Sequence, residues 1–237
     1  MKVVGLVSCY REGRLVRKAI ESLQVPGIDA VYAFEGPAGP PISAECPESD
    51  IPETISPLDG ALVTGLWQTD AAKRTVMVKH VQNKHPDERV WGVWVDGDEV
   101  LMNGEYLRDI LQALDWRDQE IAGWPIRLVE LDGTVATVRA KVIRIDLIAN
   151  YVVSSSGIRF KTGVTQAEGN LPMRLADWWI PERMAALEQG NMVLSPPLPG
   201  EPHLLHRSSL RHPARVGLRM HEQEAVELGK LGVKIPH

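Results

Sequence analysis

Hydrophobic positions in the first hundred residues follow two patterns, one typical of buried strands and one typical of helices. Continuous apolar runs at 3–8, 29–34 and 90–95 have the length and composition of parallel strands that are buried on both faces. Between the first two runs, apolar residues recur at helical spacing over 15–23, and a Pro-Gly pair ends that helix. Strands and helices therefore alternate here, which is typical of an α/β sheet.

Weaker signals complete the first half of the chain. Residues 36–60 are rich in Pro, Gly and Ser and have no period, so we expect a long irregular loop, which in a compact domain is often functional. A short strand is predicted at 62–63. Asp70 and Asn103 are the expected N-terminal caps of two further helices.

The second half has a different pattern. Asp132-Gly133 between two β-prone runs predicts a hairpin, and 141–146 alternates as a half-buried strand does. We expect a loop over 163–176, a short helix over 182–189 and a tail from His203 that is basic and then helical. The predicted fold class is α/β: a mostly parallel central sheet flanked by helices, with a mixed hairpin and helix region added to it.

Composition and charge exclude several classes of protein. The chain has 237 residues, of which 44% are hydrophobic and 24% charged, and this suits one large domain or two halves that share a core. A net charge of -5 gives no general basic surface for nucleic acid or anionic lipid. Two cysteines are too few for a disulfide framework, and the first apolar run is too short for a signal peptide. No apolar run approaches the roughly 18 residues of a membrane span, so we expect a cytoplasmic protein.

Three carboxylates directly follow the apolar run at 90–95, in the sequence Asp96-Gly97-Asp98-Glu99. Ligands of open parallel sheets bind beyond the carboxyl ends of the strands, and hard divalent cations prefer carboxylate oxygens. Residues two apart point to the same side of an extended chain, while Gly97 lets the backbone approach a ligand closely. An isolated Asp-x-Asp is often only a surface turn, but the buried strand before this one favours a metal site.

Four motifs follow one another in order along the first half. They are Val4-Gly-Leu-Val-Ser-Cys-Tyr-Arg-Glu12, then Glu35 after the second strand, then Lys73-Arg74 early in a helix, and then Trp94-Val-Asp-Gly-Asp-Glu99. This order resembles the GT-A-type, family 2-like glycosyltransferases over about residues 3 to 110. The resemblance implies a GT-A-like (Rossmann-like) fold. It implies a nucleotide-sugar-binding half over 1–115 and an acceptor-binding half with a basic C-terminal tail over 116–237, in one continuous domain.

The resemblance also implies roles for individual residues. The nucleotide sugar would be held by Cys9, Tyr10, Arg11, Glu12, Glu35, Lys73, Arg74, Asp96 and Gly97, and Mn2+ or Mg2+ by Asp96, Asp98 and His206. The donor would be a nucleoside-diphosphate sugar, and we expect a UDP-sugar. Arg11 stands where the family usually has asparagine, and Glu35 where aspartate is commoner. Without the resemblance, Lys73 and Arg74 fit a solvated helix face equally well.

The tail contains two histidines and a series of arginines. The arginines recur every four residues as Arg207, Arg211, Arg215 and Arg219, after His203 and His206. Like charges at this spacing repel each other, so either an anionic ligand or partner lies against them or carboxylates of the chain fold over them. In the resembled family a C-terminal histidine can complete the metal shell. His206 fits that role by position, and His203 is the second candidate.

A catalytic base is predicted from the acceptor half. Inverting members of the resembled family use a carboxylate to deprotonate the attacking hydroxyl, and Asp177, before Trp178-Trp179, is our first candidate, with Glu168 second. The two tryptophans can stack on a sugar, although core packing is the simpler interpretation. A retaining enzyme would need no such base.

The sequence thus predicts a metal-dependent glycosyltransferase that moves a sugar from a nucleoside-diphosphate sugar to an acceptor hydroxyl. A sugar-nucleotide nucleotidyltransferase is one alternative, but its usual glycine-rich basic loop is not found over 8–13. A non-catalytic transferase-like binding module is the other alternative. The chain lacks Gly-x-x-x-x-Gly-Lys-Ser/Thr, which excludes a P-loop enzyme. The acceptor stays open among a glycan, a protein, a lipid-linked sugar and modified nucleic acid, and so does homo-oligomerisation.

Overall fold

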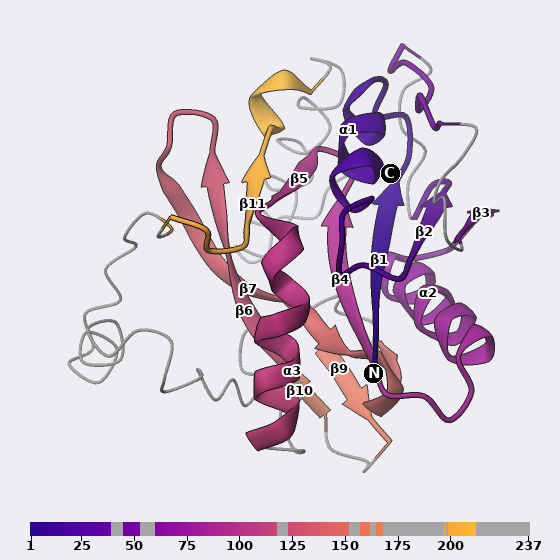
Figure 1. Ribbon diagram of the computed structural model, residues 1–237. Helices are drawn as coiled ribbons and strands as arrows, with labels where there is room; N and C mark the ends of the chain where they lie inside the picture. Colours follow the sequence, from indigo (N-terminus) through magenta and orange to yellow (C-terminus); the bar gives the residue numbers. More distant parts are fainter. Residues whose placement is uncertain are drawn as a thin grey trace, which may run out of the picture.

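A computed structural model describes residues 1–38, 45–52, 60–117, 123–151, 157–161, 165–167, 197 and 199–211 (Figure 1). Its strands are β1 (Lys2–Cys9), β2 (Ala30–Glu35), β3 (Gly60–Thr64), β4 (Val90–Asp96), β5 (Glu99–Met102), β6 (Gly123–Glu130), β7 (Val135–Arg144), β8 (Ile148–Tyr151), β9 (Gly157–Phe160), β10 (Thr165–Ala167) and β11 (His203–His206). Its helices are α1 (Leu15–Ser22), α2 (Asp70–Lys84) and α3 (Leu107–Arg117), with short 3-10 turns η1 (Gly104–Tyr106), η2 (Ile145–Leu147) and η4 (Ser208–Leu210).

The main sheet has eight strands in the order β3-β2-β1-β4-β7-β6-β11-β5. Strands β3, β2, β1 and β4 run parallel to one another. Beyond them, β7 is antiparallel to both β4 and β6, β11 is parallel to β6, and β5 is antiparallel to β11. The α/β class is confirmed, but the sheet is mixed rather than mostly parallel. The physical reason is the β6–β7 hairpin, whose short turn forces its two strands to run in opposite directions.

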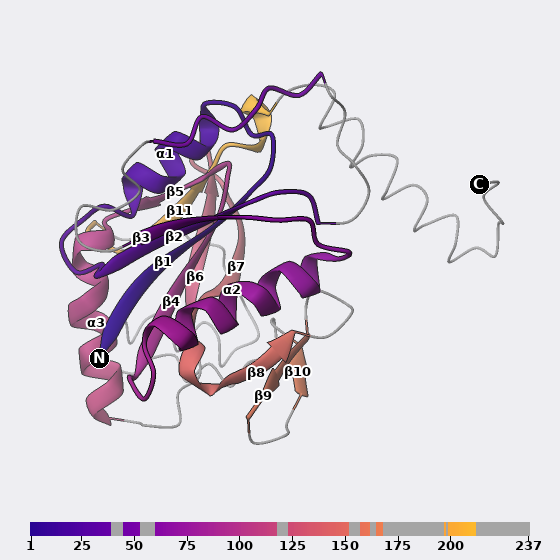
Figure 2. The same cartoon turned by 90° about the vertical axis from the view of Figure 1, so that its right-hand side faces the viewer.

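Each face of the sheet is covered by its own hydrophobic core. Figure 2 shows the sheet nearly edge-on, with α1 and α3 on one side and α2 with the small sheet of β8, β9 and β10 on the other. Side chains of a strand point alternately to opposite faces, so Val3 and Val7 of β1 pack with α1 and α3, while Val4 and Leu6 pack with α2. The unbroken apolar runs follow from this two-sided burial.

Local chemistry sets several boundaries of these elements. The side chain of Thr69 accepts a hydrogen bond from the backbone N of Ala72 at 3.1 Å, so Thr69 caps α2 and the expected cap, Asp70, is its first residue. Asn103 has a left-handed conformation before η1 and makes no capping bond there, which corrects the second predicted cap. The predicted hairpin turn is confirmed, with Gly133 at a φ of 86°.

One prediction for the second half is wrong, because strand pairing overrides a weak local signal. Residues 165–167, expected within a loop, form β10 by pairing with β9. The basic segment from His203 begins as β11, a strand that the sequence did not indicate, and is held between β6 and β5 by backbone hydrogen bonds on both sides. The structure does not describe residues 212–237, the later part of the tail. The predicted helix over 182–189 lies outside the described residues.

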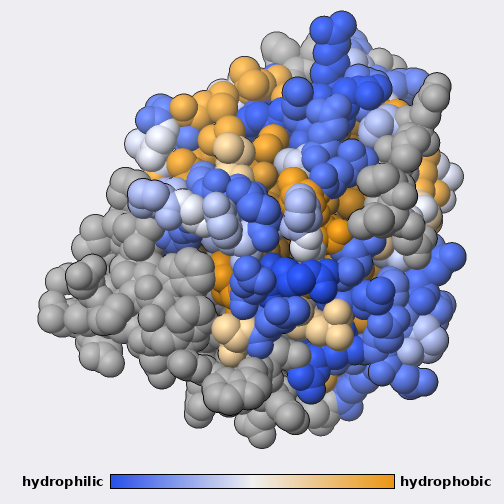
Figure 3. Space-filling view, in the orientation of Figure 1, coloured by the Kyte–Doolittle hydropathy of each residue, from blue (hydrophilic) through white to orange (hydrophobic). Residues whose placement is uncertain are grey.

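The surface seen in Figure 3 is mostly hydrophilic, with hydrophobic side chains gathered in its upper left part. Exposed large hydrophobic residues include Leu131 at the β6–β7 turn and Leu210 after β11. Among the described residues, no helix is both long enough and apolar enough to cross a membrane.

Candidate functional site

The carboxyl ends of three neighbouring strands meet at one edge of the sheet, as the sequence predicts. The register pairs Cys9 of β1 with Glu35 of β2, and Ser8 of β1 with Asp96 of β4. The backbone N of Gly97 donates to the carbonyl of Ser8 at 3.0 Å. A Cβ atom on Gly97 would lie 2.6 Å from Cγ of Glu12, so only glycine allows this close approach.

Asp98 is the buried centre of the site. Its side chain is fully buried, and its Oδ1 accepts a hydrogen bond from Nη2 of Arg211 at 2.6 Å. Nε2 of His206 lies 3.2 Å from Oδ2, an ion-pair distance, although no described residue makes a directed hydrogen bond to that oxygen. Burial alone would raise the pKa of Asp98, but the contacts with His206 and Arg211 outweigh it and hold the pKa below its usual value.

His206 is held in place from its other side by Glu130. The register of β11 sets His206 opposite Glu99 on β5 and Glu130 on β6, and Nδ1 lies 2.8 Å from Oε1 of Glu130. The contact with Asp98 and then the hydrogen bond to Glu130 raise the pKa of His206 to about 9. At neutral pH, His206 therefore carries a proton and joins two carboxylates.

Arg207 fixes the chain that leads from His206 to Arg211. Its backbone N and its Nε both donate to the carbonyl of Asp98, at 3.0 and 3.3 Å, and its Nη2 donates to the carbonyl of Leu15. Of the predicted arginine series, Arg207 and Arg211 thus turn inward to the Asp-Gly-Asp loop. Arg215 and Arg219 lie outside the described residues.

Asp96 has a different environment from Asp98. Its Oδ2 accepts a hydrogen bond from Nζ of Lys141 at 2.9 Å, and 39% of its side-chain surface is exposed. Burial would raise the pKa of Asp96, but Lys141 and then Arg74 lower it. Glu99 accepts from the backbone N of Asp96 at 2.8 Å and from Lys141. These contacts give Glu99 a structural role in the turn.

The turn after β1 carries the predicted nucleotide-pocket residues. Arg11 has a φ of 51°, and its backbone N donates to Oε1 of Glu35 at 3.4 Å. The other oxygen of Glu35 is buried without a hydrogen bond from any residue that the structure describes. Tyr10 lies beneath the Arg11 guanidinium, 5.9 Å from ring centroid to Cζ. Cys9 is buried and donates to the carbonyl of Phe34, so its thiol faces the interior.

A segment at 45–52 holds this turn from outside. The backbone N of Glu12 donates to Oγ of Ser49 at 3.3 Å, and Nη1 of Arg11 donates to the carbonyl of Cys46 at 2.9 Å. Arg17 makes a two-pronged ion pair with Asp50, at 2.8 and 2.6 Å. This segment lies within the long loop predicted over 36–60.

Lys73 and Arg74 occupy different positions although they are neighbours. Lys73 is buried, and its Nζ donates to the carbonyls of Cys9 and Gly36 at 2.9 and 3.0 Å, so it ties together the ends of β1 and β2. Burial lowers its pKa. Arg74 stacks near the rings of Trp94 and Tyr151 and donates to Asp70. The charge of Arg74 also lowers the pKa of Asp96, so its guanidinium acts on that carboxylate.

Several site residues were not found from the sequence. Lys141, Glu130 and the inward role of Arg211 all depend on pairing between strands that are distant in the chain. The predicted bases, Asp177 and Glu168, lie outside the described residues. Among the described residues, no group of three His, Cys, Asp or Glu side chains has the arrangement of a complete metal site.

No protein-family model matches the chain, and no curated protein matches it. Among solved structures, the chain is similar to a crystal structure of TarS from S. aureus, at 14% identity and a TM-score of 0.35, over 62% of this chain and 29% of that chain. It is likewise similar to a crystal structure of TarS 1-349, at 12% identity and a TM-score of 0.35, over 62% of this chain and 48% of that chain. The chain spans less than half the length of either structure, and a likeness this distant leaves the function to be argued from the site.

Proposed function

We propose that the chain is a glycosyltransferase that uses a nucleoside-diphosphate sugar and a divalent metal ion. The observation that carries the proposal is the pair of Asp98 and His206, 3.2 Å apart, which lies near Asp96 at the carboxyl ends of the parallel strands and next to the turn with Arg11 and Glu35. This is the edge where open α/β sheets bind nucleotides. The sequence resemblance stated above supplies the reaction class.

The donor atoms suit Mn2+ or Mg2+. Two cis ligands of an octahedral ion with bonds of about 2.1 Å lie about 3 Å apart, and Nε2 of His206 and Oδ2 of Asp98 are 3.2 Å apart. Oδ2 is a buried carboxylate oxygen that lacks a hydrogen bond from the described residues. Glu130 on the far nitrogen of His206 is the kind of outer partner that orients a metal-binding imidazole.

Such ions bind through one or two protein ligands and take the rest of their shell from phosphates and water. Asp98 and His206 would hold the ion, and Asp96 would reach it or the ribose from the more exposed side. When bound, the ion would supply Lewis-acid stabilisation of the departing diphosphate. The protein's own residues then have separate tasks, which the contacts above suggest.

Glu35 is suited to read the nucleoside. Its free buried oxygen would accept a hydrogen bond from a ribose hydroxyl or a base N–H, while its other oxygen stays on the backbone of Arg11. Arg74, between two aromatic rings and close to Asp96, would pair with a phosphate oxygen. Lys73 would act indirectly, by holding the ends of β1 and β2 in register. Asp177 and Glu168 stay our candidates for the base.

The test is a melting experiment with UDP, GDP and TDP, each with and without Mn2+. A ligand that binds only the folded protein, at a hundred times its dissociation constant, adds about 2.7 kcal/mol to the free energy of unfolding. For a chain of this length that is a rise in Tm of roughly 5–11 °C. Asp98→Asn should abolish the part of the rise that depends on Mn2+.

Asp146→Asn is the matched control. Asp146 also pairs with a buried arginine, Arg144, but it lies at the amino end of β4, where its Oδ1 accepts from the backbone N of Val90. This variant should lower the Tm without changing the shift caused by ligand. If no nucleoside diphosphate stabilises the wild-type protein, the proposal fails. If one does, hydrolysis of a sugar nucleotide without acceptor distinguishes a transferase from a binding module. Release of pyrophosphate from a nucleoside triphosphate together with a sugar phosphate would instead indicate a nucleotidyltransferase.

A further inference from the structure

Lys141 is a buried lysine whose ammonium is enclosed by two acidic side chains of the Asp-Gly-Asp-Glu turn. Only 6% of its side-chain surface is exposed. Its Nζ lies 2.7 Å from each carboxylate oxygen of Glu99 and 2.9 Å from Oδ2 of Asp96. An ammonium has three N–H groups, and three carboxylate oxygens surround this one. The lysine reaches the turn from β7, a strand that is remote in sequence and antiparallel to β4.

These contacts hold Asp96 at two points. Glu99 accepts from the backbone N of Asp96 at 2.8 Å and also from Lys141, which in turn donates to the Asp96 side chain. The inner oxygen of Asp96, Oδ2, is therefore committed to the protein. Its other oxygen, Oδ1, takes no part in these contacts, and 39% of the side-chain surface is exposed.

Stability does not explain this arrangement. Burying charged groups costs desolvation energy, and well-packed apolar residues of similar size stabilise a protein as well or better. Met at position 141 would fill a similar volume, with no need for Glu99 or its charge. What an ionic arrangement adds is a single defined orientation of the groups that it joins, which is useful where a carboxylate must meet a ligand.

We propose that Lys141 is a positioning residue, which holds Asp96 so that Oδ1 faces the ligand while Oδ2 is fixed. Lys141 itself does not touch the ligand. The identity of the ligand as a metal–nucleotide complex rests on the proposed function. The fixed orientation of Asp96 does not rest on it. The two statements can therefore be tested separately.

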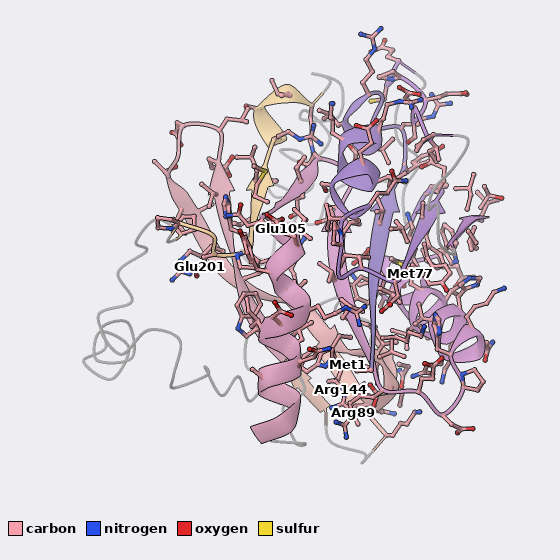
Figure 4. The ribbon with its side chains drawn as sticks, viewed as in Figure 1. Met1, Met77, Arg89, Glu105, Arg144 and Glu201 are labelled. Carbon is pink, nitrogen blue, oxygen red and sulfur yellow. The ribbon has the colours of Figure 1, made fainter. Side chains whose placement is uncertain are left out.

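Three variants make the test. Lys141→Met removes the ammonium. Arg144→Met is the matched control, since Arg144 is a buried cation on the same strand, paired with Asp146, and lies opposite Trp91 near the amino end of β4 (Figure 4). The double variant Lys141→Met/Glu99→Gln loses one buried charge of each sign. The side-chain amide oxygen introduced at position 99 can still accept a hydrogen bond from the backbone N of Asp96. It restores stability if Lys141→Met alone folds poorly.

The first measurement needs no ligand. Exposed carboxylates are labelled with a carbodiimide and glycine ethyl ester, and the labelling rate of Asp96 is read by mass spectrometry. We expect faster labelling of Asp96 in Lys141→Met and in the double variant, and an unchanged rate in Arg144→Met. Equal Asp96 labelling in all four proteins would overturn the inference.

The second measurement is calorimetric binding of Mn2+ with UDP, GDP or TDP, whichever the wild-type protein binds. Loss of an outer partner that orients a metal ligand weakens binding about 10- to 100-fold. We expect that loss in Lys141→Met and in the double variant, and wild-type affinity in Arg144→Met. Wild-type affinity in the double variant would show that Lys141 acts only as a counter-charge to Glu99, and would refute positioning. If the wild-type protein binds none of the three, the proposed function fails while the labelling result still decides the role of Lys141.

Discussion

Arg211→Met tests the most deeply buried contact of the site. The pair that it breaks has a fully buried carboxylate, that of Asp98, and a guanidinium with 4% of its side chain exposed, 2.6 Å apart. Removing one partner of a buried ion pair typically costs about 3–5 kcal/mol, because the other charge stays buried without compensation. His206, 3.2 Å from the other oxygen of Asp98, offsets part of this, so we expect a loss near the lower limit.

That loss should appear as a fall in Tm of roughly 6–12 °C for a chain of this length. Arg17→Met is the matched control, since Arg17 also donates to a carboxylate, Asp50, at 2.6 Å, but both of these side chains are about 40% exposed. Exposed pairs contribute about 0–1 kcal/mol. The shortest nitrogen–oxygen distance is therefore the same in the two pairs, whereas their burial differs. Differential scanning calorimetry on the two variants measures both effects.

A double-mutant cycle with Asp98→Asn then isolates the pair itself. If Arg211 acts through Asp98, the double variant should be more stable than the sum of the single losses predicts, with a coupling of about 1–3 kcal/mol. Losses that add to within about 0.5 kcal/mol would refute the contact. An Arg211→Met loss no larger than that of Arg17→Met would refute the argument from burial.

Three further predictions concern packing and pH. Gly97→Ala would bring a methyl group to 2.6 Å from Cγ of Glu12 and should lower the free energy of unfolding in urea by about 1–3 kcal/mol. The double variant Gly97→Ala/Glu12→Ala should recover most of this loss. Full wild-type stability in the single variant would contradict the close packing of Gly97 against Glu12. Burial and then Lys84 lower the pKa of His80 from 6.5. The unfolded chain therefore binds more protons than the folded one just below pH 6.5, so the free energy of unfolding should fall as the pH drops through that range. His80→Gln should reduce this pH dependence, and an unchanged profile would assign it to other groups. Tyr32→Phe removes the hydroxyl that lies 3.0 Å from Nε2 of His85 in the core under α2. Thermal melting should show a loss of about 1–3 kcal/mol in the free energy of unfolding. An unchanged stability would mean that this hydrogen bond makes no net contribution.

The part of the site that could be predicted from the sequence comes from parallel strands. Cys9, Glu35 and Asp96 each end an apolar run, and parallel strands bring such ends to one edge whatever the details of the loops. The helices α1 and α2 were likewise visible from spacing, because each packs one face on the sheet. These inferences need only the periodicity of a local segment.

The rest depends on pairings between distant segments. The alternating pattern over 141–146 predicts that Lys141 is an exposed residue of a half-buried strand. Its burial against Asp96 follows only from the pairing of β7 with β4. The strand β11 has four residues and no periodicity of its own, so its position between two other strands could not be seen. The contact of Arg211 with Asp98 and the role of Glu130 were not predicted for the same reason, since Arg211 follows β11 and Glu130 pairs with it across β6.

The insertion of β11 has a consequence for how the protein is made. On the ribosome, β5 and β6 emerge long before His203–His206, and until then both lack a neighbour on the side that β11 later fills. Contacts so distant in sequence form late and slowly. The nascent chain therefore carries open strand edges and an Asp98 without Arg211 or His206 until residues 203–211 have been synthesised. Newly made protein should be most prone to aggregation in this interval, and the acidic site should be among the last parts of the molecule to form.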